Sequence, residues 1–511
     1  MKKFILIFLL VYLISYRSDS QQLLWANTAG GPGDDEAEAL ISDEAGNIYV
    51  TGFFKSPSIT LGTTTLKNVN ASHSDVFLAK IDNTGKVIWA KSLGGGEEDQ
   101  PLGIALDNKG NIIIRGYSES DNLKAGNVEI RNDFKSEAGM FIAKYANNGD
   151  LLWMKSSYIF PQGIAIDAEG SIFVTGETYP NDEAKFEDIN LVNPEKSFVV
   201  AKYSSEGKVQ WAKLGAGGKS NDIAVDISGN VFVSGTFRKI MYFENGQRFK
   251  SAGPDNTDDM FLLKYNSKGN LSWVQTAGGQ GDEEPRAIRS DKAGNIFVVL
   301  RYSSINLALG KSKKHSNGGG DDLLLIKYDP TGNVLWAESA GGSGHDNPVY
   351  LSLDQDGNVF LTGHYYSNEI TFDNITLTNV GQNDIFIVKY SNAGKVQWAK
   401  TTGTSNYDYP NGQLLDAKGN LYVIGIFNSS NSKEKVVDEF FMEKYDVSGN
   451  LQWRNKEHRT DFSDYAFGEA MDKDGNLFVV GFFSGSIKFA NTTYKSSGSK
   501  DMFVVKFQTI K

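Results

Sequence analysis

Acidic side chains recur at a fixed place in a repeated segment of this chain, and aligned carboxylates can bind a hard cation or act as general acids and bases. The repeat is marked by the turn sequence Asp-x-x-Gly-Asn, which occurs eight times with one departure, Ser171 in place of Asn. The position eight residues before the turn aspartate is acidic in six copies, while Ile159 and Gly218 occupy the other two. The six acids are Asp35, Asp99, Glu283, Asp346, Asp408 and Asp464.

A second acidic set lies five residues before a lysine that also occurs once per repeat. Its members are Asp75, Asp259, Asp322, Asp384, Glu439 and Asp501. We expect the first set to surround the mouth of a central channel and the second set to lie on the same face. Two interpretations stay open. In the first, the carboxylates bind a cation such as Ca²⁺ or a basic partner. In the second, each carboxylate caps its own loop by accepting backbone N–H groups. The sequence does not identify the metal.

Strand signals define the unit that positions these acids. Each turn precedes a run of β-branched and aromatic residues, as at 48–52, and a third strand ends on the recurring lysine. A fourth strand carries a tryptophan, and the intervals between tryptophans run from 55 to 64 residues. Four strands per unit with short turns describe a propeller blade. The tryptophans are Trp25, Trp89, Trp153, Trp211, Trp273, Trp336, Trp398 and Trp453.

The two ends of the chain predict how the units close on one another. Residues 23–26 form a lone tryptophan strand, and residues 501–506 form a third strand that lacks its outer neighbour. We therefore predict an all-β fold, a single eight-bladed β-propeller over residues 21–511. Its blades are four-stranded and antiparallel, and the N-terminal strand with Trp25 completes the last one. The predicted blades are 35–92, 99–156, 159–214, 219–276, 283–339, 346–402, 408–456 and 464–511 with 22–28.

The repeated tryptophans, lysines and turn aspartates are interpreted as structural. An indole supplies a large apolar area for packing between blades, and each lysine is expected to pair with a turn aspartate. The turns at Asp354 and Asp472 also suggest a calcium loop, but an EF-hand needs a glutamate at position twelve, where Tyr365 and Phe483 stand. A tight turn in which the aspartate accepts backbone N–H bonds is the preferred interpretation.

Composition and the N-terminus indicate an exported protein. Residues 1–20 pair Lys2 and Lys3 with an apolar run, the pattern of a signal peptide, and an uncleaved N-terminal anchor is the alternative. No cysteine occurs, which excludes disulfides and thiolate metal sites. Without residues 1–20 the chain has 48 basic and 61 acidic residues, a net charge of −13, which argues against nucleic acid as a partner. We expect a monomer without a transmembrane segment that is secreted, periplasmic or at the cell surface.

The repeat resembles the SBBP β-propeller family. The resemblance rests on Asp-x-x-Gly-Asn-Ile-Tyr-Val-Thr-Gly at the second strand, Asp-x-Phe-Leu-Ala-Lys at the third and Gly-Lys-Val-x-Trp-Ala at the fourth. It covers most of residues 22–507 and implies an exported or cell-surface propeller without an assigned activity. The segment 79–89 is also similar to the docking turn of quinoprotein dehydrogenases, although its turn is one residue shorter.

No catalytic motif accompanies the acids. The five histidines are His73, His315, His345, His364 and His458, and none of them has the spacing of a metal motif. No Gly-x-Ser-x-Gly elbow or phosphate-binding loop occurs. We therefore predict a non-enzymatic scaffold that binds a protein, glycan or cation through its acidic face. The alternative is a polysaccharide hydrolase or lyase that uses carboxylates at the channel mouth.

Overall fold

The computed structural model describes residues 22–132, 138–192, 195–309, 312–315, 319–430, 436–457 and 465–508. Every regular element in these residues is a β-strand, so the all-β prediction is confirmed. Within the same ranges no helix is long and apolar enough to cross a membrane. The proposed signal peptide, residues 1–20, and Asp464 lie outside the described residues.

The strands follow one antiparallel order that recurs along the chain, with a first, second, third and outer strand in each unit. The first strands are β2 (Asp35–Ser42), β8 (Asp99–Leu106), β14 (Phe160–Ile166), β24 (Glu283–Ser290), β30 (Asp346–Leu353), β36 (Asp408–Leu415) and β40 (Tyr465–Met471). The second strands are β3 (Ile48–Phe54), β9 (Ile112–Ser118), β15 (Ile172–Thr178), β20 (Val231–Phe243), β25 (Ile296–Tyr302), β31 (Val359–Tyr365), β37 (Leu421–Ser430) and β41 (Leu477–Phe483).

The remaining two strands of each unit complete its sheet. The third strands are β6 (Asp75–Ile81), β12 (Gly139–Tyr145), β18 (Ser197–Tyr203), β22 (Asp259–Tyr265), β28 (Asp322–Tyr328), β34 (Asp384–Tyr390), β38 (Val436–Tyr445) and β44 (Asp501–Gln508). The outer strands are β7 (Val87–Gly94), β13 (Leu151–Ser157), β19 (Val209–Val225), β23 (Leu271–Gly278), β29 (Val334–Ala340), β35 (Val396–Thr402), β39 (Leu451–Glu457) and β1 (Gln22–Ala29).

Short hairpins fill most of the connections between second and third strands. Most have two short strands joined by a tight turn, whereas β21 pairs with the end of β20, and β10 and β26 also pair with the outer strands β7 and β23. β37 and β38 pair directly with each other, and residues 431–435 between them lie outside the described residues. The hairpin strands are β4 (Ser58–Leu61), β5 (Thr64–Lys67), β10 (Asn122–Ala125), β11 (Val128–Arg131), β16 (Glu183–Phe186), β17 (Ile189–Val192), β21 (Arg248–Lys250), β26 (Asn306–Leu309), β27 (Ser312–His315), β32 (Glu369–Phe372), β33 (Ile375–Thr378), β42 (Ser486–Phe489) and β43 (Thr492–Lys495).

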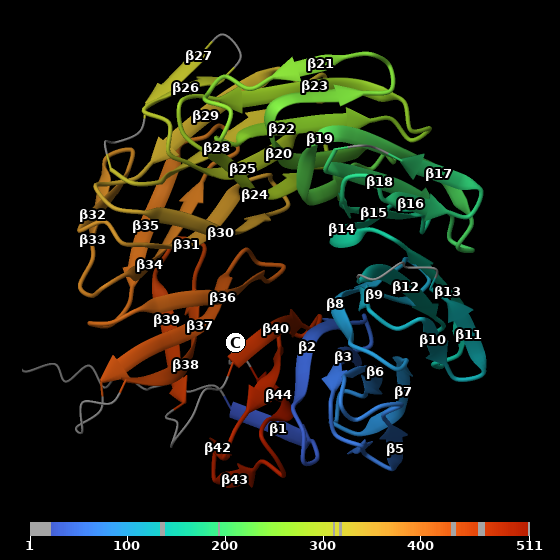
Figure 1. The fold of residues 1–511 in the computed structure, drawn as a ribbon. Coiled ribbons are helices and arrows are strands. Elements are labelled where there is room, and N and C mark those ends of the chain that lie inside the picture. Colours follow the sequence, from blue (N-terminus) through green and yellow to red (C-terminus); the bar gives the residue numbers. More distant parts are fainter. Residues whose placement is uncertain are drawn as a thin grey trace, which may run out of the picture.

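The first and last described strands belong to the same sheet. β1 pairs antiparallel with β44, with Trp25 opposite Lys506 and Thr28 opposite Phe503. The first strand of that sheet, β40, contacts β2. Figure 1 shows the sheets arranged around a common centre, with β1 and β44 beside β2 and β3.

One strand runs across a predicted blade boundary. Blades were expected to divide between residues 214 and 219, but β19 runs through this point as a single strand. It pairs with β18 on one side and β20 on the other, with bulges between Ala216 and Gly218 and between Ser220 and Asp222. The spacing from Trp211 to Asp226 is 15 residues, against 18 from Trp89 to Asp107. The outer strand of one unit therefore continues as the first strand of the next, although the still shorter spacing of 14 residues from Trp153 to Asp167 leaves β13 and β14 as separate strands.

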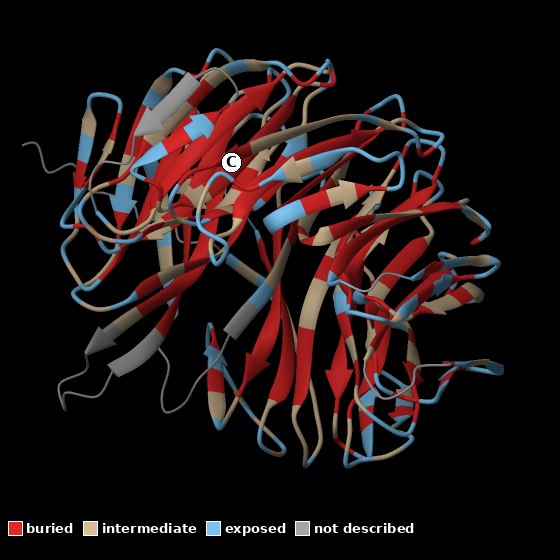
Figure 2. Ribbon diagram, turned by 45° about the horizontal axis from the view of Figure 1, so that its top comes forward, coloured by how far each residue is buried: buried red, intermediate tan, exposed pale blue. Residues whose placement is uncertain are grey.

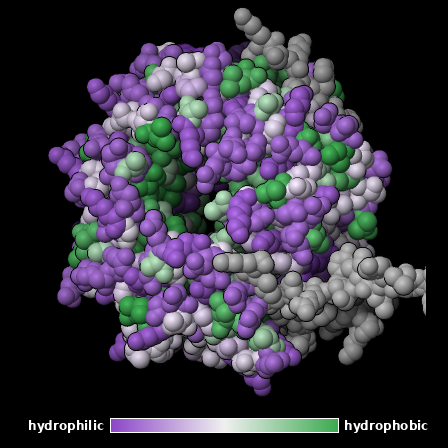
Figure 3. Space-filling view, turned by 180° about the vertical axis from the view of Figure 1, so that it is seen from behind, coloured by the Kyte–Doolittle hydropathy of each residue, from purple (hydrophilic) through white to green (hydrophobic). Residues whose placement is uncertain are grey.

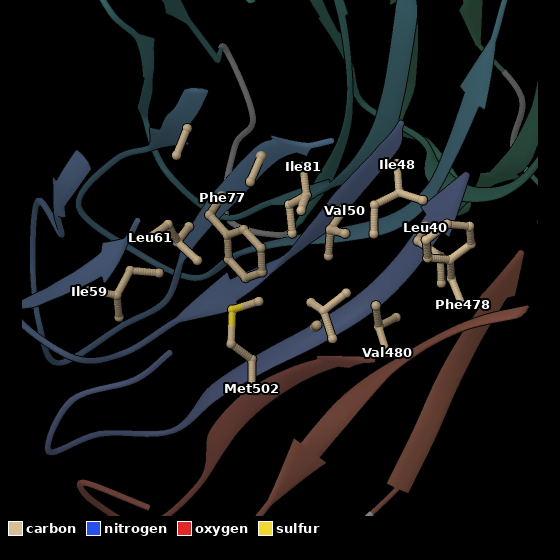
Figure 4. Close-up of a cluster of buried hydrophobic side chains, with 14 of the residues drawn as sticks. Leu40, Ile48, Val50, Ile59, Leu61, Phe77, Ile81, Phe478, Val480 and Met502 are labelled. Carbon is tan, nitrogen blue, oxygen red and sulfur yellow. The ribbon is translucent and has the colours of Figure 1, made fainter. Parts of the chain in front are cut away.

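The hydrophobic core lies between neighbouring sheets. Figure 2 shows buried residues along the strands and exposed residues in the loops and outer hairpins. One cluster joins Val50 and Phe77 of the first complete sheet with Phe478, Val480 and Met502 of the sheet that contains β1. Figure 4 shows these side chains meeting between the two groups of strands. This packing holds the ends of the chain together through apolar contact as well as through strand pairing.

Candidate functional site

Seven of the eight repeated tryptophans dock on a turn of the following unit, whereas Nε1 of Trp453 has no hydrogen-bond partner among the described residues. The Nε1–H of Trp336 donates to the backbone carbonyl of Asn392 at 3.0 Å, and Nζ of Lys327 donates to the same oxygen at 3.4 Å. Gly394 in that turn has φ of +82°, and a Cβ there would lie 2.8 Å from Cδ2 of the indole. The same indole bond joins Trp25 to Asn83, Trp89 to Asn147, Trp153 to Ser205, Trp211 to Ser267, Trp273 to Pro330 and Trp398 to Val447.

The predicted burial of the tryptophans is only partly right. Trp211 and Trp398 are buried, at 8% and 7% exposure, whereas the other six are half-buried. The reason is that the indole covers a glycine turn at the edge of the unit rather than filling the interior between sheets. A glycine is needed in that turn both for its positive φ and for the close approach of the ring. The tryptophans nevertheless have the structural role that was predicted.

The turn aspartates and strand-ending lysines form the expected ion pairs in six units. Lys144 Nζ lies 2.9 Å from Asp107 Oδ2, and both side chains are buried. The other pairs are Lys202–Asp167, Lys264–Asp226, Lys327–Asp291, Lys389–Asp354 and Lys506–Asp472. Asp107 Oδ1 also accepts the backbone N–H groups of Lys109 and Asn111, both at 2.9 Å. These bonds confirm the tight-turn interpretation of the repeated aspartates.

The first acidic set is placed at the start of the first strands, where its five described members are buried and its four described aspartates cap loops. Asp99 accepts the N–H of Gly95 at 2.7 Å and the hydroxyl of Ser120 at 2.9 Å. Asp408 accepts the N–H groups of Thr404 at 2.6 Å and Asn428 at 3.1 Å. Asp35 and Asp346 repeat the Asp99 pattern with Gly31 and Ser56, and with Gly342 and Ser367. Glu283 is likewise fully buried.

Burial sets the protonation of these acids. Desolvation raises the pKa of Asp99 to about 7, that of Asp408 to about 7 and that of Glu283 to about 8. It also raises the pKa of Asp35 and Asp346, where the serine hydroxyls offset part of the effect. Protonated acids in this set are less repulsive than a ring of carboxylates would be. The geometry favours the capping interpretation, and binding of a ligand by these residues stays a prediction.

The second acidic set meets the first in pairs across neighbouring units. A Cβ on Gly403 would lie 2.4 Å from Oδ1 of Asp384 and 2.9 Å from Oδ2 of Asp408. Asp384 accepts the N–H of Val380 at 3.1 Å, so it too caps a loop. The negative charge of the second-set acid raises the pKa of its first-set neighbour in the pairs Asp501–Asp35, Asp75–Asp99, Asp259–Glu283 and Asp384–Asp408.

The two sets therefore form separate inter-unit pairs rather than one shared site. In the described ranges no three or more His, Asp or Glu side chains are grouped so that they could hold a metal ion. The acid is absent from two units because their loops are short. Only 14 residues separate Trp153 from Asp167 and 15 separate Trp211 from Asp226, against 18 in the units of Trp25, Trp89, Trp273, Trp336 and Trp398. This difference in spacing could have identified the acids as loop caps from the sequence alone.

Sequence reasoning missed a group of aromatic residues beside these caps. Tyr366 follows β31, Tyr407 immediately precedes β36, and Tyr409 lies at the beginning of β36. His364 of β31 contacts two of the three rings. The available signal was at Tyr407, because the equivalent position is charged or imidazole-bearing in four other units. Figure 3 shows that the face seen from behind is hollowed near its centre, with hydrophobic residues on part of the wall.

Comparison with known proteins supports the repeat fold. No family model matches the chain. An uncharacterised WD repeat-containing protein of Acanthamoeba polyphaga mimivirus is 24% identical over 84% of this chain and 39% of its own length. The regulatory protein FlaEY of Caulobacter vibrioides is 25% identical over 34% of this chain and 20% of its own. The chain thus spans about two fifths and one fifth of these relatives.

Among solved structures, the Dos1 propeller covers 95% of this chain and 94% of its own with a TM-score of 0.48 and 8% identity. The recurring four-stranded antiparallel units, together with the WD repeat-containing relative, show that this chain is a β-propeller repeat protein.

Proposed function

We propose that this chain is an exported, non-enzymatic binding scaffold of the SBBP type. In this proposal residues 21–511 form a single ring of eight blades, and β1 closes the ring as the outer strand of the last blade. The scaffold binds a protein, glycan or cation through the face on which the first strands begin. The proposal includes export and a final location in the periplasm, at the cell surface or outside the cell, and the signal-peptide pattern of residues 1–20 supports it.

The contacts at the ends of the chain support the closed ring. Trp25 of β1 and Lys506 of β44 both donate to the carbonyl of Asn83, at 3.2 and 3.3 Å. The same pair of donors meets one turn carbonyl at the Trp153, Trp273, Trp336 and Trp398 positions. The junction between the last and first units is thus built like the junctions between units that follow one another in the chain.

The observation that carries the scaffold proposal is the use of the repeated polar side chains. Seven of the tryptophans are engaged in docking, six lysine–aspartate pairs are formed, and four first-set aspartates cap loops. A hydrolase or lyase would instead need two carboxyl groups about 5–9.5 Å apart that reach a substrate. Asp35, Asp99, Glu283, Asp346 and Asp408 are all 0% exposed, so they favour the scaffold over the enzyme.

A ligand screen by thermal shift tests the proposal. The purified chain is heated with Ca²⁺, with poly-lysine as a basic partner, and with neutral and acidic oligosaccharides. We expect a saturable rise in the melting temperature with at least one of these probes. The double variant Asp346→Asn, Asp408→Asn separates the two roles of the acids. If they only cap loops, the variant changes stability without removing the response to the probe. If they bind Ca²⁺ or poly-lysine, the variant loses that response.

A further inference from the structure

Three tyrosines gather between the units of β30 and β36. The hydroxyls of Tyr366 and Tyr409 are hydrogen-bonded at 3.1 Å, and the rings of Tyr366 and Tyr407 have centroids 6.4 Å apart with 57° between their planes. His364 packs against two of them, with centroids 5.1 Å from Tyr409 and 5.8 Å from Tyr366. Tyr366 is 36% exposed and Tyr407 is 43% exposed, so both present a ring to solvent. We call Tyr366, Tyr407 and Tyr409 the tyrosine cluster.

The loops that carry the tyrosine cluster are fixed by the buried acids. Asp346 Oδ2 accepts the hydroxyl of Ser367 at 2.8 Å, next to Tyr366 in the chain. The N–H of Tyr366 donates to the carbonyl of His345 at 2.9 Å. Asp408 lies between Tyr407 and Tyr409, and the carbonyl of Tyr407 accepts the N–H of Asn428 at 3.1 Å. Loops tied in this way present exposed rings at low entropic cost when a ligand binds.

The tyrosine cluster is a departure from the repeat. The position of Tyr407, one residue before the first-set acid, is charged or imidazole-bearing in four of the five other units that have this acid, and Ser463 occupies it in the fifth. The position of Tyr409, one residue after that acid, holds acids or amides in four of those units and a tyrosine, Tyr465, in the fifth. A residue that stabilises the repeat is expected in every unit, whereas a ligand site uses a few units unequally. The equivalents of Tyr407 are Asp34, Glu98, Asp282 and His345, and those of Tyr409 are Glu36, Gln100, Glu284 and Asn347.

Charges near the tyrosine cluster are paired with one another. Arg301 contacts Glu284 at 2.8 Å and Asp321 at 3.1 Å, and Arg286 contacts Glu284 at 3.2 Å. Burial, together with the positive charge of Arg286, lowers the pKa of His364 to about 4, so its imidazole is uncharged near neutral pH. Exposed phenol rings whose described ionic neighbours Arg286 and Arg301 are paired suit a ligand that has apolar C–H faces and hydroxyl groups but no net charge.

We propose that the tyrosine cluster binds a neutral oligosaccharide, whose sugar rings stack on Tyr366 and Tyr407 and whose hydroxyls bond to the phenol groups. This inference rests on the proposed binding function and names its ligand class. It also gives the buried acids of these two units a role, because Asp346 and Asp408 position the loops that carry the tyrosines.

Isothermal titration of the purified chain with cellohexaose, xylohexaose, mannohexaose and laminarihexaose tests the inference. At least one of these neutral probes should bind. Tyr366→Ala and Tyr407→Ala should each weaken that binding about tenfold, because each removes one stacking ring. Tyr407→Phe keeps the ring and should retain most of the affinity. Tyr179→Ala is the matched control, since Tyr179 is 44% exposed in another unit and its loss should change nothing.

Each outcome of the titration decides a specific point. Both alanine changes replace exposed rings, so an unchanged melting temperature without ligand would show that the variants are folded. Equal binding by the wild type and both alanine variants would overturn the inference. Binding of a proline-rich peptide, but of no neutral oligosaccharide, would overturn it as well. If only Ca²⁺ or poly-lysine raises the melting temperature, the tyrosine site is wrong while the binding scaffold stands. If no probe binds, both are wrong.

Discussion

Replacing one docking tryptophan should weaken a junction between two units. Trp336→Ala removes the bond from Nε1 to the carbonyl of Asn392 and the contact of the indole with Gly394. It also removes the contact with Phe297, whose ring centroid is 5.9 Å from that of Trp336. The carbonyl of Asn392 keeps the Lys327 ammonium as a donor, so the change leaves no orphaned acceptor.

The size of the effect follows from the burial of the indole. Truncating a fully buried tryptophan costs about 3–5 kcal/mol. Trp336 is half-buried, and the lost hydrogen bond contributes about 1 kcal/mol. We therefore expect Trp336→Ala to lower the free energy of unfolding by about 2–4 kcal/mol.

The assay is equilibrium unfolding in urea followed by far-ultraviolet circular dichroism, which does not depend on the indole signal. Leu335→Ala is the matched control on the same strand, β29, because Leu335 is 53% exposed. Its effect should stay within about 0.5 kcal/mol. If the two variants lost equal stability, the docking role of the tryptophans would be wrong.

Three further perturbations test the contacts that stabilise the repeated units. Gly394→Ala forces φ of +82° on a residue with a Cβ and places that atom 2.8 Å from the indole. It should lower the free energy of unfolding by about 1–3 kcal/mol. A double-mutant cycle should show a smaller loss in a Trp336→Ala background. Asp99 has a folded pKa of about 7, above its ordinary value of 3.8, so its contribution to stability is present below pH 4 and lost as pH rises through 7. Asp99→Asn should therefore raise the melting temperature, relative to the wild type, more at pH 8.5 than at pH 5.5; the same difference at both pH values would contradict the burial argument. Deleting residues 22–29 removes β1 and should lower the melting temperature of the whole chain, whereas an unchanged value would show that β1 does not close the ring.

Much of the repeated fold could be predicted, because one physical requirement decides which residue occupies each repeat position. A tryptophan recurs where its indole packs on a glycine turn of the next unit. A lysine recurs where its ammonium group pairs with a turn aspartate. The strand signals around residues 48–52 and 501–506 were therefore reliable in every copy. The continuous strand β19 could not be predicted from the spacing, because the shorter connection after Trp153 is interrupted between β13 and β14.

The candidate site was harder to predict, because residues that recur in every repeat are those with a structural role. The acids Asp99 and Asp408 share an offset since each caps an equivalent loop, so their repetition was a sign of structure. Of the three tyrosines, Tyr407 has no tyrosine at the equivalent position of another unit, whereas Tyr179 and Tyr465 are the equivalents of Tyr366 and Tyr409. The three come together from the end of β31 and the beginning of β36. Their proximity depends on how neighbouring units pack, which the order of residues along the chain does not reveal.

The most direct test of the account is to ask whether a bound oligosaccharide leaves the protein unchanged. The purified chain is incubated with each neutral oligosaccharide that raises its melting temperature, and the sugar is then examined by mass spectrometry. A binding scaffold predicts a saturable rise in melting temperature and recovery of the oligosaccharide at its original mass. Shortened or unsaturated products would contradict the account and favour the hydrolase or lyase alternative.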